Sequence, residues 1–226
     1  MRRPLLGGLV LVAGALVYVG LRWKTHHADA AAGRALPSRG PVFEVVRVDD
    51  DLELQPGSDP LPTGLTTEVE TVAGRQHLYF QLQVPQGLTN PEARDQATGW
   101  IQAHVQLPPD DAVVWSVASA PGAPLRSYFL RGQPFVSSAD LAGAEAVAGD
   151  QADDPPRLRL RLTPGATPRF ESVRRTWTGK RLALLLEGTV VGAPLADASA
   201  DLVLTLGRGA TLENAQVLAA ALAPRR

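Results

Sequence analysis

The sequence contains no cysteine, which excludes disulfide bridges, thiolate metal sites and cysteine nucleophiles. Aromatic residues make up only 5% of the 226 residues, which argues against a stacking platform for nucleic-acid bases. The net charge of −1 provides no general attraction for nucleic acid. Glycine (21) and proline (19) interrupt the chain too often for a bundle of long helices. Composition therefore excludes several kinds of site but names no activity.

The sequence also lacks the short motifs that mark common active sites. It has no serine nucleophile elbow, zinc-protease helix motif, phosphate-binding loop or dinucleotide fingerprint. The acidic pairs Asp110–Asp111 and Asp153–Asp154 could act as general acid and base, but solvated loop ends are the favoured interpretation. The triplet Asp49–Asp51 is likewise expected to form a solvated turn, because the spaced ligands of a calcium loop are missing. We therefore expect no enzyme, no metal site and no cofactor.

An uncharged run over residues 5–21, flanked by basic residues on both sides, predicts a membrane segment. As a helix it is about 25 Å long, enough for a short bilayer span. The alternative is a signal peptide cleaved at residues 28–30 (ADA). We favour an uncleaved signal anchor over residues 1–24, because basic residues separate the apolar run from that site. Residues 25–40 then form a flexible tether, and the bulk of the chain lies outside the cytoplasm at a bacterial inner membrane.

Apolar and β-branched residues alternate in short segments, which predicts strands joined by turns. The predicted strands cover residues 42–48, 65–72, 76–84, 112–118, 127–131, 157–162, 181–186, 189–191 and 202–206. Helices are predicted to begin at Asn90, Ser138, Thr167 and Thr211, whose side chains can cap a helix. This order predicts an α+β fold, a mixed β-sheet with helices packed on it. We divide it into an N-terminal half, residues 41–124, and a C-terminal half, residues 125–223.

Basic residues are concentrated between residues 157 and 181, where eight of them stand against one acidic residue. Arg157, Arg159 and Arg161 alternate with leucines, so they occupy one face of a strand. With Arg174 and Arg175 they form a candidate basic face for an acidic partner or anionic lipid headgroups. The favoured alternative is structural, since charged residues on an exposed sheet face or edge discourage aggregation.

Residues 179–194, GKRLALLLEGTVVGAP, resemble the segment G-K-x-L-A-I-V-L-D-G-x-V-x-S-A-P of SecD, a subunit of the bacterial protein-export machinery. That segment lies in the head of the first periplasmic domain of SecD. The helix predicted after Thr211 is similar to the T-x-E-x-A-x-x-L-A-x-x-L helix of the same head. Residues 135–141 and 160–170 resemble two further stretches of it, V-L-T-G-x-D-L and L-T-x-x-G-A-x-x-F. The resemblance extends over residues 126–222, in order, and residues 42–120 have no match.

The resemblance implies a SecD-type head held at the membrane by a single anchor. In SecD the head is followed by a block of transmembrane helices that carries proton-coupled work, and we expect the present chain to lack that motor. Gly192 stands where serine is usual in the motif. The motif residues are expected to have a structural role: Gly179, Lys180, Gly188, Ala193 and Pro194.

Two functions follow from the resemblance. The first is a membrane-anchored, extracytoplasmic binding module that contacts unfolded or translocating polypeptide in protein export, with Sec translocon components as partners. The second is a structural or interaction domain of the envelope that reuses the fold without an export role. A strand edge left open beside Pro194 would serve the first function by β-augmentation. If Pro194 only ends a hairpin strand, it has no such role.

Overall fold

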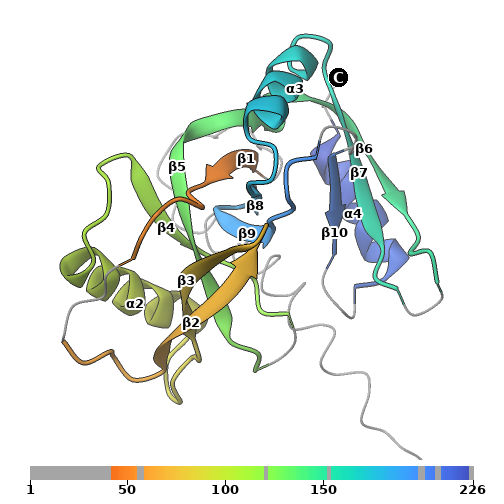
Figure 1. Ribbon diagram of the computed structural model, residues 1–226. Helices are drawn as coiled ribbons and strands as arrows, with labels where there is room; N and C mark the ends of the chain where they lie inside the picture. Colours follow the sequence, from red (N-terminus) through yellow and green to blue (C-terminus); the bar gives the residue numbers. More distant parts are fainter. Residues whose placement is uncertain are drawn as a thin grey trace, which may run out of the picture. The chain divides into compact units, whose positions relative to one another are not determined.

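The computed structural model describes residues 42–54, 59–119, 122–151, 154–197, 202–206 and 210–223 (Figure 1). The predicted membrane helix and the tether lie outside these residues. Among the described helices, none is both long enough and apolar enough to cross a bilayer.

Antiparallel strands dominate the described part of the chain, with three helices packed on them. The strands are β1 (Phe43–Val48), β2 (Leu65–Val72), β3 (Arg75–Leu82), β4 (Asp111–Trp115), β5 (Leu125–Ser137), β6 (Leu141–Val147), β7 (Arg157–Leu162), β8 (Leu182–Leu186), β9 (Thr189–Gly192) and β10 (Leu202–Thr205). The helices are α2 (Asn90–His104), α3 (Thr167–Thr176) and α4 (Leu212–Leu222). The predicted α+β class is confirmed.

The larger sheet is organised around β5, and its strand order is β2-β3-β5-β1-β8-β9, with β4 also paired to β5. Arg131 of β5 is opposite β1 on one side and β4 on the other. Nearer the start of β5, Arg126 is opposite Gln81 of β3. On its other side, the carbonyl oxygen of Arg126 accepts a hydrogen bond from the N–H of Ser116. β3 and β1 therefore follow one another along the same edge of β5, with a gap between them.

A parallel bridge closes five of these strands into a ring. Ser116, just after β4, pairs with Val190 of β9, and the N–H of Val117 donates to the carbonyl oxygen of Val190 at 3.0 Å. The ring runs β4-β5-β1-β8-β9. It encloses a small core of buried residues: Val46, Val48, Leu130, Ala183, Leu185 and Val190. Because β9 is paired on both sides, β2 is the strand of this sheet with a fully open edge in the described part of the chain.

The other buried apolar residues form two larger cores. The α2 helix packs beside β3, β4 and β5, and its Ile101 is buried against Phe80 and Trp115. A second sheet has the order β10-β7-β6, and α4 packs against its β6 and β7 strands (Figure 1). Leu158 and Leu204 of this sheet are almost fully buried. Burial of each such leucine contributes roughly 2 kcal/mol to stability.

The predicted strands at residues 65–72 and 76–84 pair as a hairpin, as do those at residues 181–186 and 189–191. Ala73 and Gly74, with φ of 47° and 79°, join β2 to β3, and Glu187 and Gly188, with φ of 51° and 69°, join β8 to β9. Positive φ at both central residues is the geometry of a type I′ turn, whose twist matches that of the flanking strands. These turns fix the register of the two hairpins.

The helix predicted to begin at Ser138 is wrong, because Leu141–Val147 form strand β6. The N–H of Ser137 donates to the Asp140 carboxylate at 2.9 Å, but this cap supports only a 3₁₀ turn over Ser138–Asp140. The alanine-rich sequence of β6 fits a strand or a helix. Pairing along the whole length of β7 and cover by α4 decide in favour of the strand.

The strand predicted over residues 127–131 is longer in the structure. Gly132 (φ 74°) and Pro134 form a bulge instead of a turn, and β5 continues through them to Ser137. β5 lies in the predicted C-terminal half, yet it pairs with β1, β3 and β4 of the N-terminal half. The two halves therefore share one sheet, and the described residues between 42 and 223 belong to one compact unit.

Candidate functional site

Three arginines of the predicted basic face lie on β7, and two of them have acidic neighbours. Leu158 and Leu160 are buried, and Arg159 and Arg161 point to the other face, as the alternation predicts. Arg157 forms an ion pair with Asp150, which raises the pKa of the guanidinium. The Nη1 atom of Arg159 lies 3.9 Å from a carboxylate oxygen of Glu145 on β6. Two of the three arginines on β7 therefore have an acidic neighbour, one on β6 and one in the loop that follows β6.

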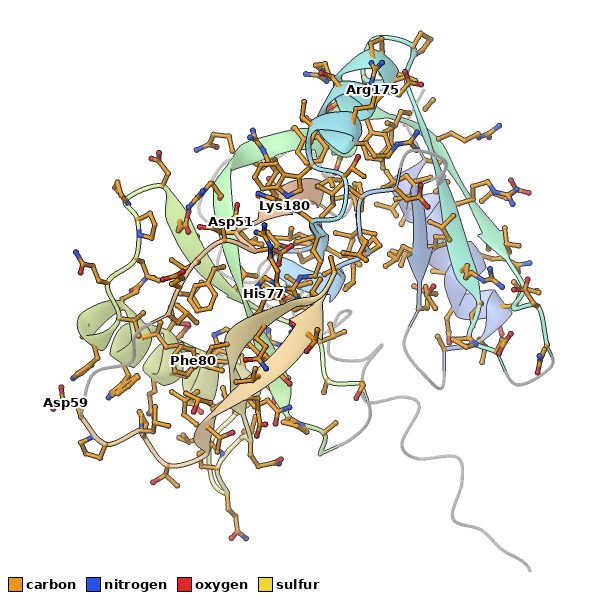
Figure 2. All side chains as sticks on the ribbon, viewed as in Figure 1. Asp51, Asp59, His77, Phe80, Arg175 and Lys180 are labelled. Carbon is orange, nitrogen blue, oxygen red and sulfur yellow. The ribbon has the colours of Figure 1, made fainter. Side chains whose placement is uncertain are left out.

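Arg174 and Arg175 stand on a different element, helix α3 (Figure 2). The Arg174 guanidinium lies over the Phe170 ring, 5.6 Å from its centroid. The Nε atom of Arg175 donates to the carbonyl oxygen of Glu171 at 3.3 Å. The five arginines are thus contributed by two elements, and their observed contacts are made within the fold.

The residues of the predicted motif lie around β8 and β9. Gly179 and Gly188 have φ of 79° and 69°, a conformation that favours glycine. Lys180 forms an ion pair with Asp51, and its Nζ atom lies 4.6 Å from the centroid of the Trp177 ring. Ala193 packs against the core inside the five-stranded ring. These contacts hold turns and strand ends together.

Of the two possibilities for Pro194, the structure excludes an open strand edge beside it. The carbonyl oxygen of Pro194 accepts from the N–H of Leu182 at 2.9 Å, and the N–H of Ala196 donates to Lys180 at 2.8 Å. The segment after β9 therefore pairs with the chain that leads into β8. Its backbone groups are used inside the fold.

A chain of charged side chains, absent from the sequence predictions, fills the gap between β1 and β3. Asp50 accepts hydrogen bonds from the backbone N–H of Arg181 at 2.6 Å and from its Nε at 2.7 Å. The Arg181 guanidinium also contacts Glu70 of β2, and Glu70 accepts from Nη1 of Arg126 at 2.6 Å. Asp50 and Arg181 are buried. We call these four residues the charge relay: Asp50, Arg181, Glu70 and Arg126.

Aromatic rings line the charge relay. The Arg126 guanidinium lies 4.2 Å from the ring centroid of Tyr79 and 4.8 Å from that of Tyr128. Burial lowers the pKa of Arg126 from its usual value. These residues line a small pocket together with His77 of β3, which Figure 2 labels. Each charge of the relay has a partner within it, so the relay connects the β2–β3 hairpin to the five-stranded ring.

A second charged group lies at the end of β1, where Asp49 and Asp111 have fully buried side chains. Arg131 contacts both carboxylates, and its Nε atom lies 3.2 Å from Oδ1 of Asp111. Burial, together with the neighbouring Asp111, raises the pKa of Asp49 to about 6, although the Arg131 charge acts in the opposite direction. The expectation of solvated loop ends is therefore wrong for Asp49, Asp50 and Asp111.

Asp51 alone of the triplet is substantially exposed. Its carboxylate is bound by Lys180, which is close to it in Figure 2, and by Nη1 of Arg75 at 3.2 Å. The hydrogen bond from Lys180 lowers the pKa of Asp51. Within the described residues, no group of three or more histidine, aspartate or glutamate side chains is arranged to hold a metal ion. Asp153 of the second predicted acidic pair lies outside the described residues.

The open edge of β2 is a surface that the sequence analysis did not identify. Val72 is opposite Arg75 across the two-residue turn, and the N–H of Gln83 donates to the carbonyl oxygen of Gly64 at 2.8 Å. In an antiparallel ladder every second residue bonds its partner strand, so the even-numbered residues of β2 bond to β3. The N–H and C=O groups of Thr67, Val69 and Thr71 therefore point away from the sheet. Val69 is 58% exposed.

Comparison with known proteins supports the resemblance found in the sequence. A 64-residue segment is 45% identical to the protein translocase subunit SecDF of Thermus thermophilus, and the match covers 28% of this chain and 8% of that protein. No protein-family model matches the chain. The chain is thus similar to SecDF over a segment that spans less than a tenth of the translocase subunit.

Solved SecDF structures are also similar to this chain at low identity. SecDF in a super-membrane-facing form is 19% identical, with a TM-score of 0.36, over 93% of this chain and 32% of that chain. A SecDF described as a membrane component that enhances protein export is 20% identical, with a TM-score of 0.34, over 80% of this chain and 92% of that chain. SecDF from Thermus thermophilus, described as a translocon-associated membrane protein, is 19% identical, with a TM-score of 0.31.

Proposed function

We propose that this chain is a membrane-anchored, extracytoplasmic module of protein export that holds extended polypeptide segments at the open edge of β2. The export context rests on the similarity to a protein translocase subunit. The observation that carries the binding mode is the row of outward-pointing backbone groups at Thr67, Val69 and Thr71. Backbone pairing recognises an extended chain with little regard to its side chains, which suits a protein that meets many sequences.

In the part of the chain that the structure describes, β2 carries no proline, lysine or bulge, and its charged residues are Glu68 and Glu70. Exposed edges are commonly blocked by proline, lysine, a bulge or a covering segment. β2 reads LTTEVETV, and its register with β3 is regular over all eight residues. The charge relay holds this hairpin through Glu70, although β3 pairs with β5 at only two positions. The edge is therefore open, and Glu70 ties the hairpin that carries it to Arg126 and Arg181. An edge held in place before binding lowers the entropy cost of binding.

Extended polypeptide fits this edge better than a second copy of the chain. In an antiparallel pair centred on Val69, Glu68 of one copy would be opposite Glu70 of the other. Like charges directly opposite one another destabilise a strand pair. The exposed side chains beside the backbone groups are threonines and a valine, which pack against β-branched or apolar residues of an added strand.

We further propose that residues 1–24 anchor the module at the bacterial inner membrane, with Sec translocon components nearby. A binding role is favoured over a catalytic one, because the charged groups of the relay are each bound to one another. Alkaline carbonate extraction and protease treatment of spheroplasts test the anchor. An intact anchor keeps the chain in the membrane fraction and exposes its body to external protease. Release of the chain by carbonate would contradict the anchor.

In vivo photocrosslinking tests the binding edge. A photoreactive residue at Thr67 is expected to capture varied secreted precursors, whereas one at Val217 of α4, which is 62% exposed, is the matched control. The substitution Val69→Pro removes an outward N–H without removing a bond to β3, so it should abolish capture at position 67. Val69→Thr should leave capture intact. Capture of one envelope protein and no precursors would instead support an envelope interaction domain without an export role.

A further inference from the structure

We propose that Asp49 and Asp111 form a proton-binding site, in which one shared proton keeps the turn after β1 in place and thereby sets how firmly the β2–β3 hairpin is held. This inference does not depend on polypeptide binding. It concerns a pair of buried carboxyl groups that the charge relay does not include.

The first argument is charge balance at a buried position. The side chains of Asp49 and Asp111 are both 0% exposed, and Arg131 is the cation that contacts the two of them. Two buried carboxylates beside one half-exposed guanidinium leave a net charge of −1 in this group. A single proton makes the group neutral, and like-charged carboxylates sharing a site characteristically hold a proton between them.

The second argument is an unmet hydrogen bond. The Oδ2 atom of Asp111 is buried and accepts no hydrogen bond from any described group. The carboxyl groups of Asp111 and Asp49 contact the same Arg131 guanidinium, and a hydrogen bond between them, which contributes to the raised pKa of Asp49, forms only when one of them is protonated. A proton on Asp49 therefore supplies the missing donor. The two oxygen atoms of Asp49 also accept hydrogen bonds, Oδ1 from the N–H of Asp51 at 3.2 Å and Oδ2 from Arg131.

The other charged groups near Asp49 and Asp111 form ion pairs with different partners. Asp51, in the same turn, is bound by Lys180 and Arg75. Arg126 and Arg181 line the same shallow pocket as Asp49, together with His77, and both arginines are paired with the acids of the relay. Arg47 of β1 is opposite Arg131 in the sheet, and its guanidinium lies over the Trp177 ring, 5.6 Å from the centroid. Among the described residues, the cation whose contacts with Asp49 and Asp111 are observed is Arg131.

The pair is linked to the hairpin through the turn. The N–H of Asp49 donates to the carbonyl oxygen of Phe129 at 2.8 Å, and the next residue, Asp50, binds Arg181 and through it Glu70 of β2. Loss of the shared proton places two negative charges in contact at the base of this turn. The expected response is a looser turn and weaker attachment of the hairpin. Because the pKa of Asp49 is raised to about 6, the change falls between pH 5 and pH 7.

Carbon-13 NMR titration of the aspartate carboxyl groups in the full-length chain tests the site directly. One carboxyl resonance, assigned by its loss in Asp49→Asn, is expected to titrate near pH 6. In Asp111→Asn the remaining Asp49 should titrate at lower pH, because its like-charged neighbour is gone. Titration of both aspartates below about pH 4.5 in the wild-type chain would overturn the proposal.

Hydrogen exchange tests the link to the hairpin. After correction for intrinsic rates, protection of the β2–β3 amides is expected to fall roughly tenfold between pH 5 and pH 7.5 in the wild-type chain. In Asp49→Asn this difference should disappear, while in Glu53→Gln, which removes an exposed neighbouring carboxylate, it should persist. Hairpin protection that is equal at the two pH values in the wild type would refute the link, even if the proton site itself is present.

Discussion

Arg181 connects the end of β1 with strand β2, two parts of the sheet that do not pair with each other. It is 8% exposed and has Asp50 on one side and Glu70 on the other. A buried guanidinium is tolerated only with carboxylate partners, and its planar fork can bind two of them at once. Arg181 therefore connects the end of β1 with the β2–β3 hairpin through side chains, at the point where backbone pairing is interrupted.

Replacing Arg181 should be costly because Asp50 would remain buried without its cation. We expect Arg181→Met to lower the free energy of unfolding by about 3 kcal/mol, measured by urea denaturation of the full-length chain in detergent. Arg75→Met is the matched control, since Arg75 is exposed and pairs with Asp51 at the surface, and it should cost less than about 1 kcal/mol.

The double variant Asp50→Asn with Arg181→Met separates charge from packing. It should recover part of the loss, because no uncompensated charge remains, while the asparagine side chain can still accept from the backbone N–H at position 181. A double variant that is no more stable than Arg181→Met would contradict the electrostatic explanation.

The charge relay could not be predicted from the sequence, because its partners are far apart in the chain. Asp50 and Arg181 are separated by 131 positions. An acidic triplet after a strand has the local pattern of a solvated turn, and nothing near it distinguishes Asp49 and Asp50 from Asp51. The basic segment from residue 157 to residue 181 did indicate a concentration of cations, but not which acidic residues they bind. Its Arg181 and Lys180 bind this triplet, whereas Arg157 and Arg159 pair with acids nearby in their own sheet.

At the scale of elements, the start of α2 shows how a local rule selects between adjacent residues. The sequence analysis predicted Asn90 as the cap, but Thr89 occupies that position and Asn90 is the first helical residue. The N–H of Thr89 donates to Glu92 Oε2 at 2.9 Å, and the Thr89 hydroxyl donates to the same oxygen at 2.8 Å. This is a capping box, in which a glutamate three residues into the helix satisfies the first backbone N–H.

Substitutions of the two candidate capping residues should have different effects on stability. Thr89→Ala should lower the free energy of unfolding by about 1 kcal/mol, because α2 covers the core around Phe80 and its first turn loses the cap. Asn90→Ala should have an effect within about 0.5 kcal/mol. Thermal denaturation of the two variants side by side distinguishes them. A larger loss for Asn90→Ala would restore the original assignment.

Periodic patterns predicted most elements, and tertiary pairing decided the rest. The alternation of Arg157–Leu162, the glycine-containing turns between β2 and β3 and between β8 and β9, and the cap at Thr211 each carry a local signal, and the structure has all of them. β6 has no such signal, because alanine and glycine fit a strand or a helix. The open edge of β2 also could not be read locally, since it depends on which strand occupies the outside of the sheet.

At the scale of the whole molecule, two groups titrate with opposite effects on stability. The pKa of Asp51 is lowered by the hydrogen bond from Lys180, so its contribution is present above pH 3.8 and is lost as the pH falls below that value. The pKa of Asp49 is raised to about 6, so its contribution is present below pH 3.8 and is lost as the pH rises through 6. The two carboxyl groups together should make the folded state most stable at mildly acidic pH, above the lowered pKa of Asp51 and below the pKa of Asp49 at about 6.

The free energy of unfolding should therefore fall as the pH rises from 4 to 7, and the decline should depend on Asp49. We expect Asp49→Asn to be nearly flat over this range and to be more stable than the wild type at pH 7.5 by about 1 to 3 kcal/mol, since a shift of two units corresponds to about 2.7 kcal/mol. Urea denaturation at half-unit pH steps measures both curves. Asp51→Asn is the opposing control, because its loss should appear on the neutral side and disappear near pH 3. Parallel curves for the wild type and Asp49→Asn would mean that Asp49 is already ionised throughout, with Arg131 supplying enough charge for both carboxylates.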